Sequence, residues 1–144
     1  MNNDQPVTKD YFIKRIGDLC LKSGLAGFPK DMTDQHILLK SAIIMIGQSG
    51  SFTEQEINEK LETWVRHISQ NKGIDRVTLR RRLVDTGYLV RSKDGASYQI
   101  APPETQPRSF EPAIEQLDIL RVLEVAREEI ARRKREYIQK AKGT

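Results

Sequence analysis

Apolar residues recur at helical spacing in the first third of the chain. Residues 8–24 repeat them at intervals of three and four, as one face of an amphipathic helix does: Phe12, Ile16, Leu19 and Cys20. Residues 34–47 hold eight apolar side chains and little polar face, which predicts a helix enclosed on most sides. We expect this second helix to lie at the centre of the core.

The next helix has a distinct start signal. Thr53 and Glu56 form the S/T-x-x-E pattern of a capping box, in which each side chain accepts a hydrogen bond from the other residue's backbone amide. Phe52 and Ile57 flank the box at the positions of a hydrophobic staple. The pattern predicts a helix from Thr53 to about residue 71. Its inner face carries Leu61, Trp64, Val65 and Ile68.

A further helix and a hairpin follow. Asp75 can cap a helix over residues 76–86, which Gly87 closes. An Asp-Gly pair then separates two short β-prone runs, 88–91 and 97–100, and this arrangement is typical of a β-hairpin. The order is helix, short extended piece, helix, helix, hairpin. The sequence therefore predicts a mainly α protein with a small β-hairpin, built as a winged helix-turn-helix.

The remainder of the chain predicts a linker and one long helix. We expect a winged-helix domain with an N-terminal helix over residues 1–100, an extended or irregular proline-rich linker over 101–112, and an amphipathic helix over 113–144. The apolar arc of the last helix is interrupted by Arg127 and Lys134. The arc consists of Ile119, Leu120, Leu123, Ala126, Ile130, Tyr137, Ile138 and Ala141.

Composition adds constraints on location and partners. The chain has 24 Lys and Arg against 20 Asp and Glu, a net charge of +4 that leans weakly toward polyanionic partners. Cys20 is the only cysteine, so no intramolecular disulfide can form and the cytoplasm is the default location. The sequence has no apolar run of 18 residues and no signal-peptide pattern at its start, so we expect a protein that neither spans a membrane nor is secreted.

Catalytic and metal-binding patterns are absent from the sequence. His36 and His67 lie on different expected helices and have no Cys or His partner at ligand spacing. The sequence has no glycine-rich phosphate loop and no nucleophile elbow. Glu54 and Glu56 are paired carboxylates, but their position assigns them to the cap of a helix. We expect no enzyme activity, no cofactor, no metal and no small-molecule substrate.

The helix over 76–86 presents two different faces. Arg80 falls on the apolar arc, so we expect it to point inward and pair with a carboxylate such as Glu54 or Glu56. Thr78, Arg81 and Arg82 lie on the opposite arc, the face that a recognition helix offers to the major groove. Asp85 shares that arc and, four residues after Arg81, can form an ordinary surface pair with it.

The expected hairpin supplies further cations. Arg91 and Lys93 lie near its tip, where a wing would contact the phosphate backbone or the minor groove. The candidate nucleic-acid-binding residues are therefore Thr78, Arg81, Arg82, Arg91 and Lys93. The aromatic residues Trp64, Tyr88 and Tyr98 lie at helical or strand-face spacing with aliphatic residues and are assigned to core packing. A second basic cluster at 132–135 is surrounded by glutamates and is interpreted as a solvated face.

Four motifs resemble a known family, the domain of unknown function twenty eighty-seven. The resemblance covers about residues 25–100. The motifs are Gly27-Phe28-Pro29-Lys30; Phe52-Thr53-Glu54-x-Glu56-Ile57-Asn58-x-x-Leu61; Asp75-x-x-x-Leu79-Arg80-Arg81-x-Leu83-Val84-Asp85-x-Gly87-x-Leu89-x-Arg91; and Asp94-Gly95-x-x-Tyr98. The resemblance implies a winged-helix-like fold in bacterial proteins that are often described as transcriptional regulators, and it lends no catalytic residue.

Two functional hypotheses follow. In the first, the protein is a transcriptional regulator that binds double-stranded DNA, with helix 76–86 in the major groove, the hairpin on the backbone and the C-terminal helix pairing two protomers. In the second, it is a protein-interaction module that acts through the C-terminal helix without binding nucleic acid.

Overall fold

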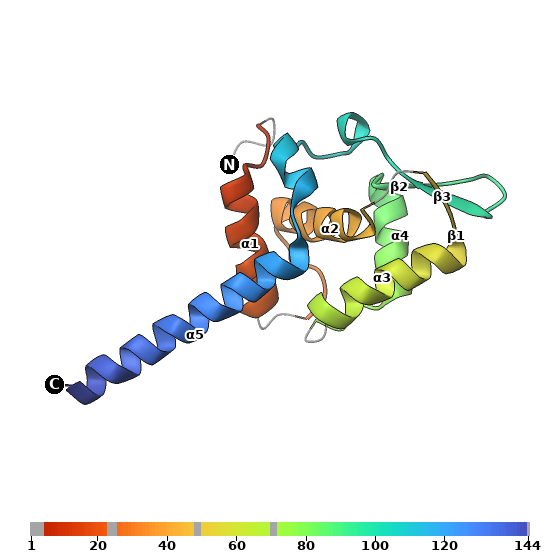
Figure 1. The fold of residues 1–144 in the computed structure, drawn as a ribbon. Coiled ribbons are helices and arrows are strands. Elements are labelled where there is room, and N and C mark those ends of the chain that lie inside the picture. The colour runs from red at the N-terminus through yellow and green to blue at the C-terminus, as the bar shows by residue number, and fades with distance from the viewer. Residues whose placement is uncertain (1–4, 23–25, 48–49, 70–71, 144) are drawn as a thin grey trace.

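The computed structural model describes residues 5–22, 26–47, 50–69 and 72–143. Its helices are α1 (Lys9–Leu21), α2 (Met32–Ile46), α3 (Glu54–Ile68), α4 (Arg76–Thr86) and α5 (Ile119–Gly143). Its strands are β1 (Ser51–Thr53), β2 (Leu89–Arg91) and β3 (Ser97–Ile100). Figure 1 shows the helices gathered around α2, the hairpin extending from one side of the molecule, and α5 projecting from the other.

The strands form one antiparallel sheet in the order β1-β3-β2. The predicted hairpin is β2 and β3, and β1 adds a third strand by pairing Phe52 with Tyr98. The extended piece expected before α3 is therefore part of the sheet. The succession α2, β1, α3, α4, β2, β3 confirms the winged helix-turn-helix, and we call the β2–β3 hairpin the wing.

The core is centred on α2, as its nearly continuous apolar sequence predicts. Ten of its fifteen residues are buried. Against it pack Phe12 and Ile16 of α1 and Leu61 and Trp64 of α3, all fully buried. The Trp64 indole donates a hydrogen bond of 2.9 Å to Ser41 Oγ, so its one polar atom is satisfied inside the core.

Local signals set the ends of α3 and α4 as expected. The Glu56 amide donates to Thr53 Oγ1 at 3.1 Å and the Thr53 amide donates to Glu56 Oε1 at 2.9 Å, which completes the capping box. Asp75 accepts the Thr78 amide at 2.7 Å and caps α4. Gly87 ends α4 with a φ of 97°, in the left-handed region that favours glycine.

The last helix begins six residues later than expected, at the first residue of its apolar arc, Ile119. The expected start at residue 113 is wrong, because residues 112–116 form a short 3-10 helix and Leu117 is extended. Asp118 starts α5 instead by accepting the Arg121 amide at 3.1 Å on its side chain. Ile119 and Leu123 are buried, and the first turns of α5 lie against α1. The rest of α5 projects from the molecule (Figure 1).

The proline-rich segment is held against the domain. The Val7 amide donates to the Ser109 carbonyl and the Glu111 amide donates to the Val7 carbonyl, both at 2.9 Å. The buried ammonium of Lys40 on α2 donates to Gln106 Oε1 at 2.7 Å and also to Glu115. The segment thus fixes the path of the chain from the end of β3 to the start of α5.

Candidate nucleic-acid interface

The inner face of α4 is fixed by packing and by one ion pair. Leu79 and Leu83 are fully buried. Arg80 Nη1 donates to Asn58 Oδ1 at 2.5 Å, and its Nη2 lies 3.5 Å from Glu54 Oε1. The Arg80 side chain is only 15% exposed. The prediction that Arg80 points inward toward a carboxylate is confirmed, and Glu54 is that partner.

The outer face of α4 borders a groove shared with the wing. Thr78, Arg81 and Asp85 are exposed on this helix. The groove has a volume of about 330 Å³ and is lined by Glu54, Arg80, Arg81, Val84, Asp85, Arg91 and Tyr98. Arg81 from the helix and Arg91 from the wing therefore line the same groove.

The tip of the wing is shaped by Asp94 and Gly95. Asp94 Oδ1 accepts hydrogen bonds from Ser92 Oγ at 2.6 Å and from the Ala96 amide at 3.0 Å. These hydrogen bonds, the Ser92 bond first, lower the pKa of Asp94. Gly95 has a φ of 74°, and a Cβ at this position would lie 2.2 Å from Arg91 Nη2. The Arg91 guanidinium thus rests directly over the turn.

Lys93 is exposed near the same tip. Its neighbour in the turn, Asp94, is also exposed. Lys93 is free to extend toward a phosphate, whereas Asp94 is engaged within the turn.

Arg82 differs from the other candidate residues. It is half-buried on the side of α4 that faces the start of α2. Its Nη1 lies 3.5 Å from Gln35 Oε1, and its guanidinium carbon lies 4.7 Å from the centre of the Phe28 ring. Adjacent side chains of a helix point about 100° apart, so Arg81 and Arg82 lie on different surfaces of the domain. The candidate set is thereby divided: Thr78, Arg81, Arg91 and Lys93 are exposed, and Arg82 packs on Phe28.

Two residues of the first turn of α4 were not assigned to the outer face by the sequence analysis. The 3.6-residue repeat places Val77 on the apolar arc with Leu79 and Leu83, yet Val77 is 38% exposed. Arg76 is half exposed and lies 3.7 Å from Glu62 of α3. The position of Val77 in the helical repeat therefore overstated its burial.

The three aromatic residues predicted to pack in the core are buried, and the second basic cluster is paired with glutamate. Trp64, Tyr88 and Tyr98 are buried, which confirms core packing. Tyr98 Oη donates to Glu54 Oε1 at 3.1 Å and so closes the wing onto α3. In the cluster at 132–135, both Arg132 and Arg133 pair with Glu129.

Burial shifts the pKa values of two side chains outside the α4–wing groove. Burial raises the pKa of the Cys20 thiol to about 12, and burial lowers the pKa of His36. His36 Nδ1 lies 2.8 Å from Tyr88 Oη, which joins α2 to the start of the wing. Within the described ranges, no group of three or more His, Cys, Asp and Glu side chains is placed to hold a metal ion. Over the same ranges, no helix has the length and apolar character needed to cross a bilayer.

Comparison with known proteins identifies the central unit. A family model described as "uncharacterized protein conserved in bacteria (DUF2087)" matches residues 24–100. The chain belongs to this family. The DUF2087 match contains α2, β1, α3, α4, β2 and β3, which is the complete winged helix, whereas α1 and α5 lie outside it. No curated protein and no solved structure matches the chain.

Proposed function

We propose that this DUF2087 protein binds double-stranded DNA and acts as a transcriptional regulator in the cytoplasm. In this proposal α4 enters the major groove and the wing contacts the phosphate backbone, as in other winged helix-turn-helix readers. The protein would act by binding rather than by catalysis. Arg81 and Thr78 would face the base edges, and Arg91 and Lys93 would neutralise phosphates.

One observation carries this proposal. Arg81, Arg91 and Lys93 are exposed on α4 and the wing, and among the described residues none of them takes part in an ion pair. Several other arginines are paired, including Arg15 with Asp34 and Arg80 with Glu54. Cations that the protein does not neutralise itself are the ones available to displace counterions from DNA.

The test is fluorescence anisotropy of a labelled duplex titrated with the protein at several salt concentrations. We expect affinity to fall steeply with salt. The double variant Arg81→Ala/Arg91→Ala should lose at least about tenfold in affinity and reduce the slope of log affinity against log salt by about two.

A control separates this surface from bulk charge. Arg66→Ala/Arg135→Ala removes the same charge from exposed positions on α3 and α5 that, like Arg81 and Arg91, take part in no ion pair among the described residues. It should keep the affinity within about threefold. Equal losses in the two double variants would contradict binding through α4 and the wing. Absence of binding at about 50 mM salt, where non-specific DNA binders are strongly favoured, would contradict DNA binding itself.

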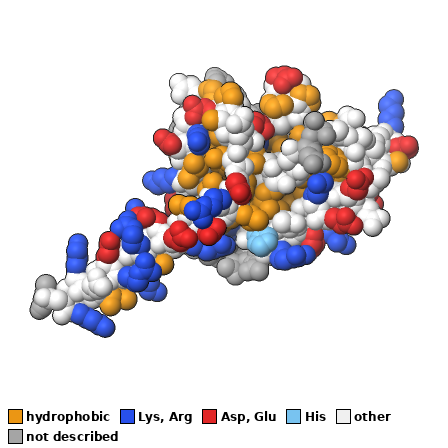
Figure 2. Space-filling model, in the orientation of Figure 1, with side chains coloured by type: hydrophobic (Ala, Val, Ile, Leu, Met, Phe, Trp, Pro, Cys, Tyr) orange, Lys and Arg blue, Asp and Glu red, His pale blue; other side chains and the backbone are white. Residues whose placement is uncertain are grey.

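The projecting half of α5 favours a second candidate function, the pairing of two copies of the chain or the docking of another protein. Ile130, Tyr137 and Ile138 are exposed there, with Tyr137 75% exposed. Residues 127–143 also carry seven Lys and Arg against three Glu, so their net charge of +4 equals that of the whole chain. Figure 2 shows Lys and Arg side chains along this part of the helix.

Charge sets an expectation for such a dimer. Two copies that bury this arc would bring Arg127 and Lys134 of each chain toward those of the other, so self-association should strengthen as salt is raised. Analytical ultracentrifugation should show a dimer that Tyr137→Glu abolishes and Val90→Ser, at an exposed apolar position of the wing, leaves intact. A monomer at every salt concentration would contradict pairing and leave the docking of a different protein as the role of α5.

A further inference from the structure

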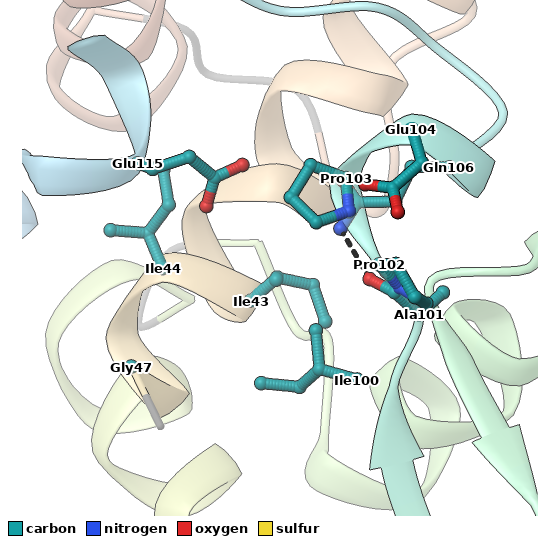
Figure 3. A pocket seen from close by; sticks show the side chains of 10 residues that line it. All are labelled: Ile43, Ile44, Gly47, Ile100, Ala101, Pro102, Pro103, Glu104, Gln106 and Glu115. Atoms are coloured by element: carbon teal, nitrogen blue, oxygen red, sulfur yellow. Dashed lines mark hydrogen bonds between the residues drawn. The ribbon is translucent and has the colours of Figure 1, made fainter. Parts of the chain in front are cut away.

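A pocket lies between α2, the end of β3 and the segment that follows the wing. Its volume is about 440 Å³, within the range of small-molecule sites. Figure 3 shows the side chains that line it: Ile43, Ile44, Gly47, Ile100, Ala101, Pro102, Pro103, Glu104, Gln106 and Glu115. Gln106 and Glu115 accept hydrogen bonds from Lys40 on α2. The pocket shares no lining residue with the α4–wing groove.

Most of the pocket wall is apolar. Ile43 and Ile44 come from α2, and Ile100 comes from the last position of β3. Ala101, Pro102 and Pro103 complete this wall from the segment after the wing. A hydrocarbon body of a ligand would therefore replace water against aliphatic side chains, which is favourable in proportion to the area it covers.

The polar groups of the pocket are mainly acceptors. Gln106 is fixed by two hydrogen bonds, because its Nε2 donates to the Ala101 carbonyl at 2.8 Å and its Oε1 accepts from Lys40 at 2.7 Å. Glu115 accepts a hydrogen bond from Lys40 through Oε1. Among the described residues, its Oε2 has no hydrogen-bond donor. Among the described residues Glu104 has no ion pair.

The two carboxylates lie at one end of the pocket. In Figure 3 Glu104 and Glu115 are near Pro103, and Ile100 and Gly47 are at the opposite end. Both glutamates also line an adjoining hollow together with Lys40 and Arg108, whereas neither of these two cations lines the pocket itself. The Lys40 ammonium is buried and already donates to Glu115 and Gln106. The charged side chains that line the pocket itself are therefore the two carboxylates.

We propose that this pocket binds a small amphipathic amine. The apolar body would lie against Ile43, Ile44 and Ile100, and the ammonium group would donate hydrogen bonds to Glu104 and to the remaining acceptor sites of Glu115. An ammonium brings three donors and a positive charge to two carboxylates, whereas an anionic ligand would be repelled by both. This inference does not depend on DNA binding, and its test contains no DNA, so either proposal can fail alone.

The test is isothermal titration calorimetry of the full chain with three probes of the same length, n-hexylamine, hexanoate and 1-hexanol, at pH 7. We expect n-hexylamine to bind most tightly and hexanoate to give no binding heat. Glu104→Gln should weaken n-hexylamine by about fivefold or more, because it replaces a charged acceptor with a neutral one. Ile100→Phe should abolish binding by filling the apolar end.

A matched variant controls for surface charge. Glu128→Gln removes the same charge from an exposed position on α5 and should leave the dissociation constant of n-hexylamine within about twofold. Thermal melts check that each variant is folded. Glu104 is exposed, so Glu104→Gln should fold and still test the proposal if Ile100→Phe does not fold. Tighter binding of hexanoate, equal losses in the two glutamine variants, or no binding of n-hexylamine would each overturn the proposal.

Discussion

Arg80 and Glu54 join the candidate recognition helix to the start of α3, with Nη2 and Oε1 3.5 Å apart. Glu54 also accepts a hydrogen bond from Tyr98 on β3. One carboxylate thus holds α4 through Arg80 and the wing through Tyr98. The angle between helix and wing, on which a winged-helix surface depends, rests in part on this shared acceptor.

Arg80→Ala should therefore reduce mainly the stability of the fold, and Arg81→Ala should reduce mainly the affinity for DNA. Arg80→Ala removes the partner of Asn58 and Glu54 at a position that is mostly buried, and it should lower the free energy of unfolding by about 1–2 kcal/mol after allowance for the exposure of Glu54. Arg81→Ala should change stability by less than about 0.5 kcal/mol and reduce DNA affinity. Urea denaturation and anisotropy measure the two effects. A stable Arg80→Ala protein would show that the pair does not hold α4.

Arg82 provides a comparison on the same helix. Its guanidinium stacks on Phe28, so Arg82→Ala should lower the free energy of unfolding by about 1 kcal/mol through lost packing and cation–π contact. DNA affinity should stay within about threefold of the unmodified chain, because Arg82 faces α2 rather than the groove. Loss of DNA binding without loss of stability would place Arg82 in the interface that the sequence first assigned to it.

Gly95→Ala tests whether Arg91 must lie over the wing turn. Gly95 and Gly73 have nearly the same left-handed backbone, with φ of 74° and 71°, but a Cβ at Gly73 meets nothing within 4 Å. Both alanine variants should lose about 1 kcal/mol through the backbone conformation. Only Gly95→Ala should also weaken DNA binding, because it displaces the Arg91 guanidinium. Equal DNA affinity in the two variants would show that the position of Arg91 over the turn is immaterial.

Local chemistry explains which parts of this fold were predictable. The capping box at Thr53, the cap at Asp75 and the Asp94-Gly95 turn each depend on residues a few positions apart, so sequence spacing was sufficient. The pairing of β1 with β3 joins Phe52 to Tyr98, 46 positions away, and no local pattern specifies it. The predicted start at residue 113 was wrong because residues 112–116 form a 3-10 helix and Asp118 caps α5, whereas the first residue of the apolar arc, Ile119, is also the first residue of α5.

In the candidate site, too, local sequence predicted some features, whereas contacts between distant residues decided others. The inward direction of Arg80 follows from its position among apolar residues. The sequence left its partner open between Glu54 and Glu56, and the structure shows Glu54. The separation of Arg82 from Arg81 depends on Phe28, which precedes α2 and reaches α4 only in the folded chain. The pocket beside Lys40 likewise needs the segment around Gln106 and Glu115 to return to α2, a contact without a sequence signature.

The N-cap of α4 gives the protein an acid-sensitive element. The hydrogen bond from the Thr78 amide lowers the pKa of Asp75 in the folded state. A carboxyl group with a lowered pKa stabilises the fold fully above its unfolded value, near 4, and loses that contribution as pH falls through the folded value. Asn caps helices about as well as Asp and does not titrate. Asp75→Asn should therefore match the unmodified chain at pH 7 in urea denaturation and lose less stability below about pH 4. Parallel stability curves for the two proteins down to pH 2 would show that the Asp75 cap does not contribute to acid unfolding.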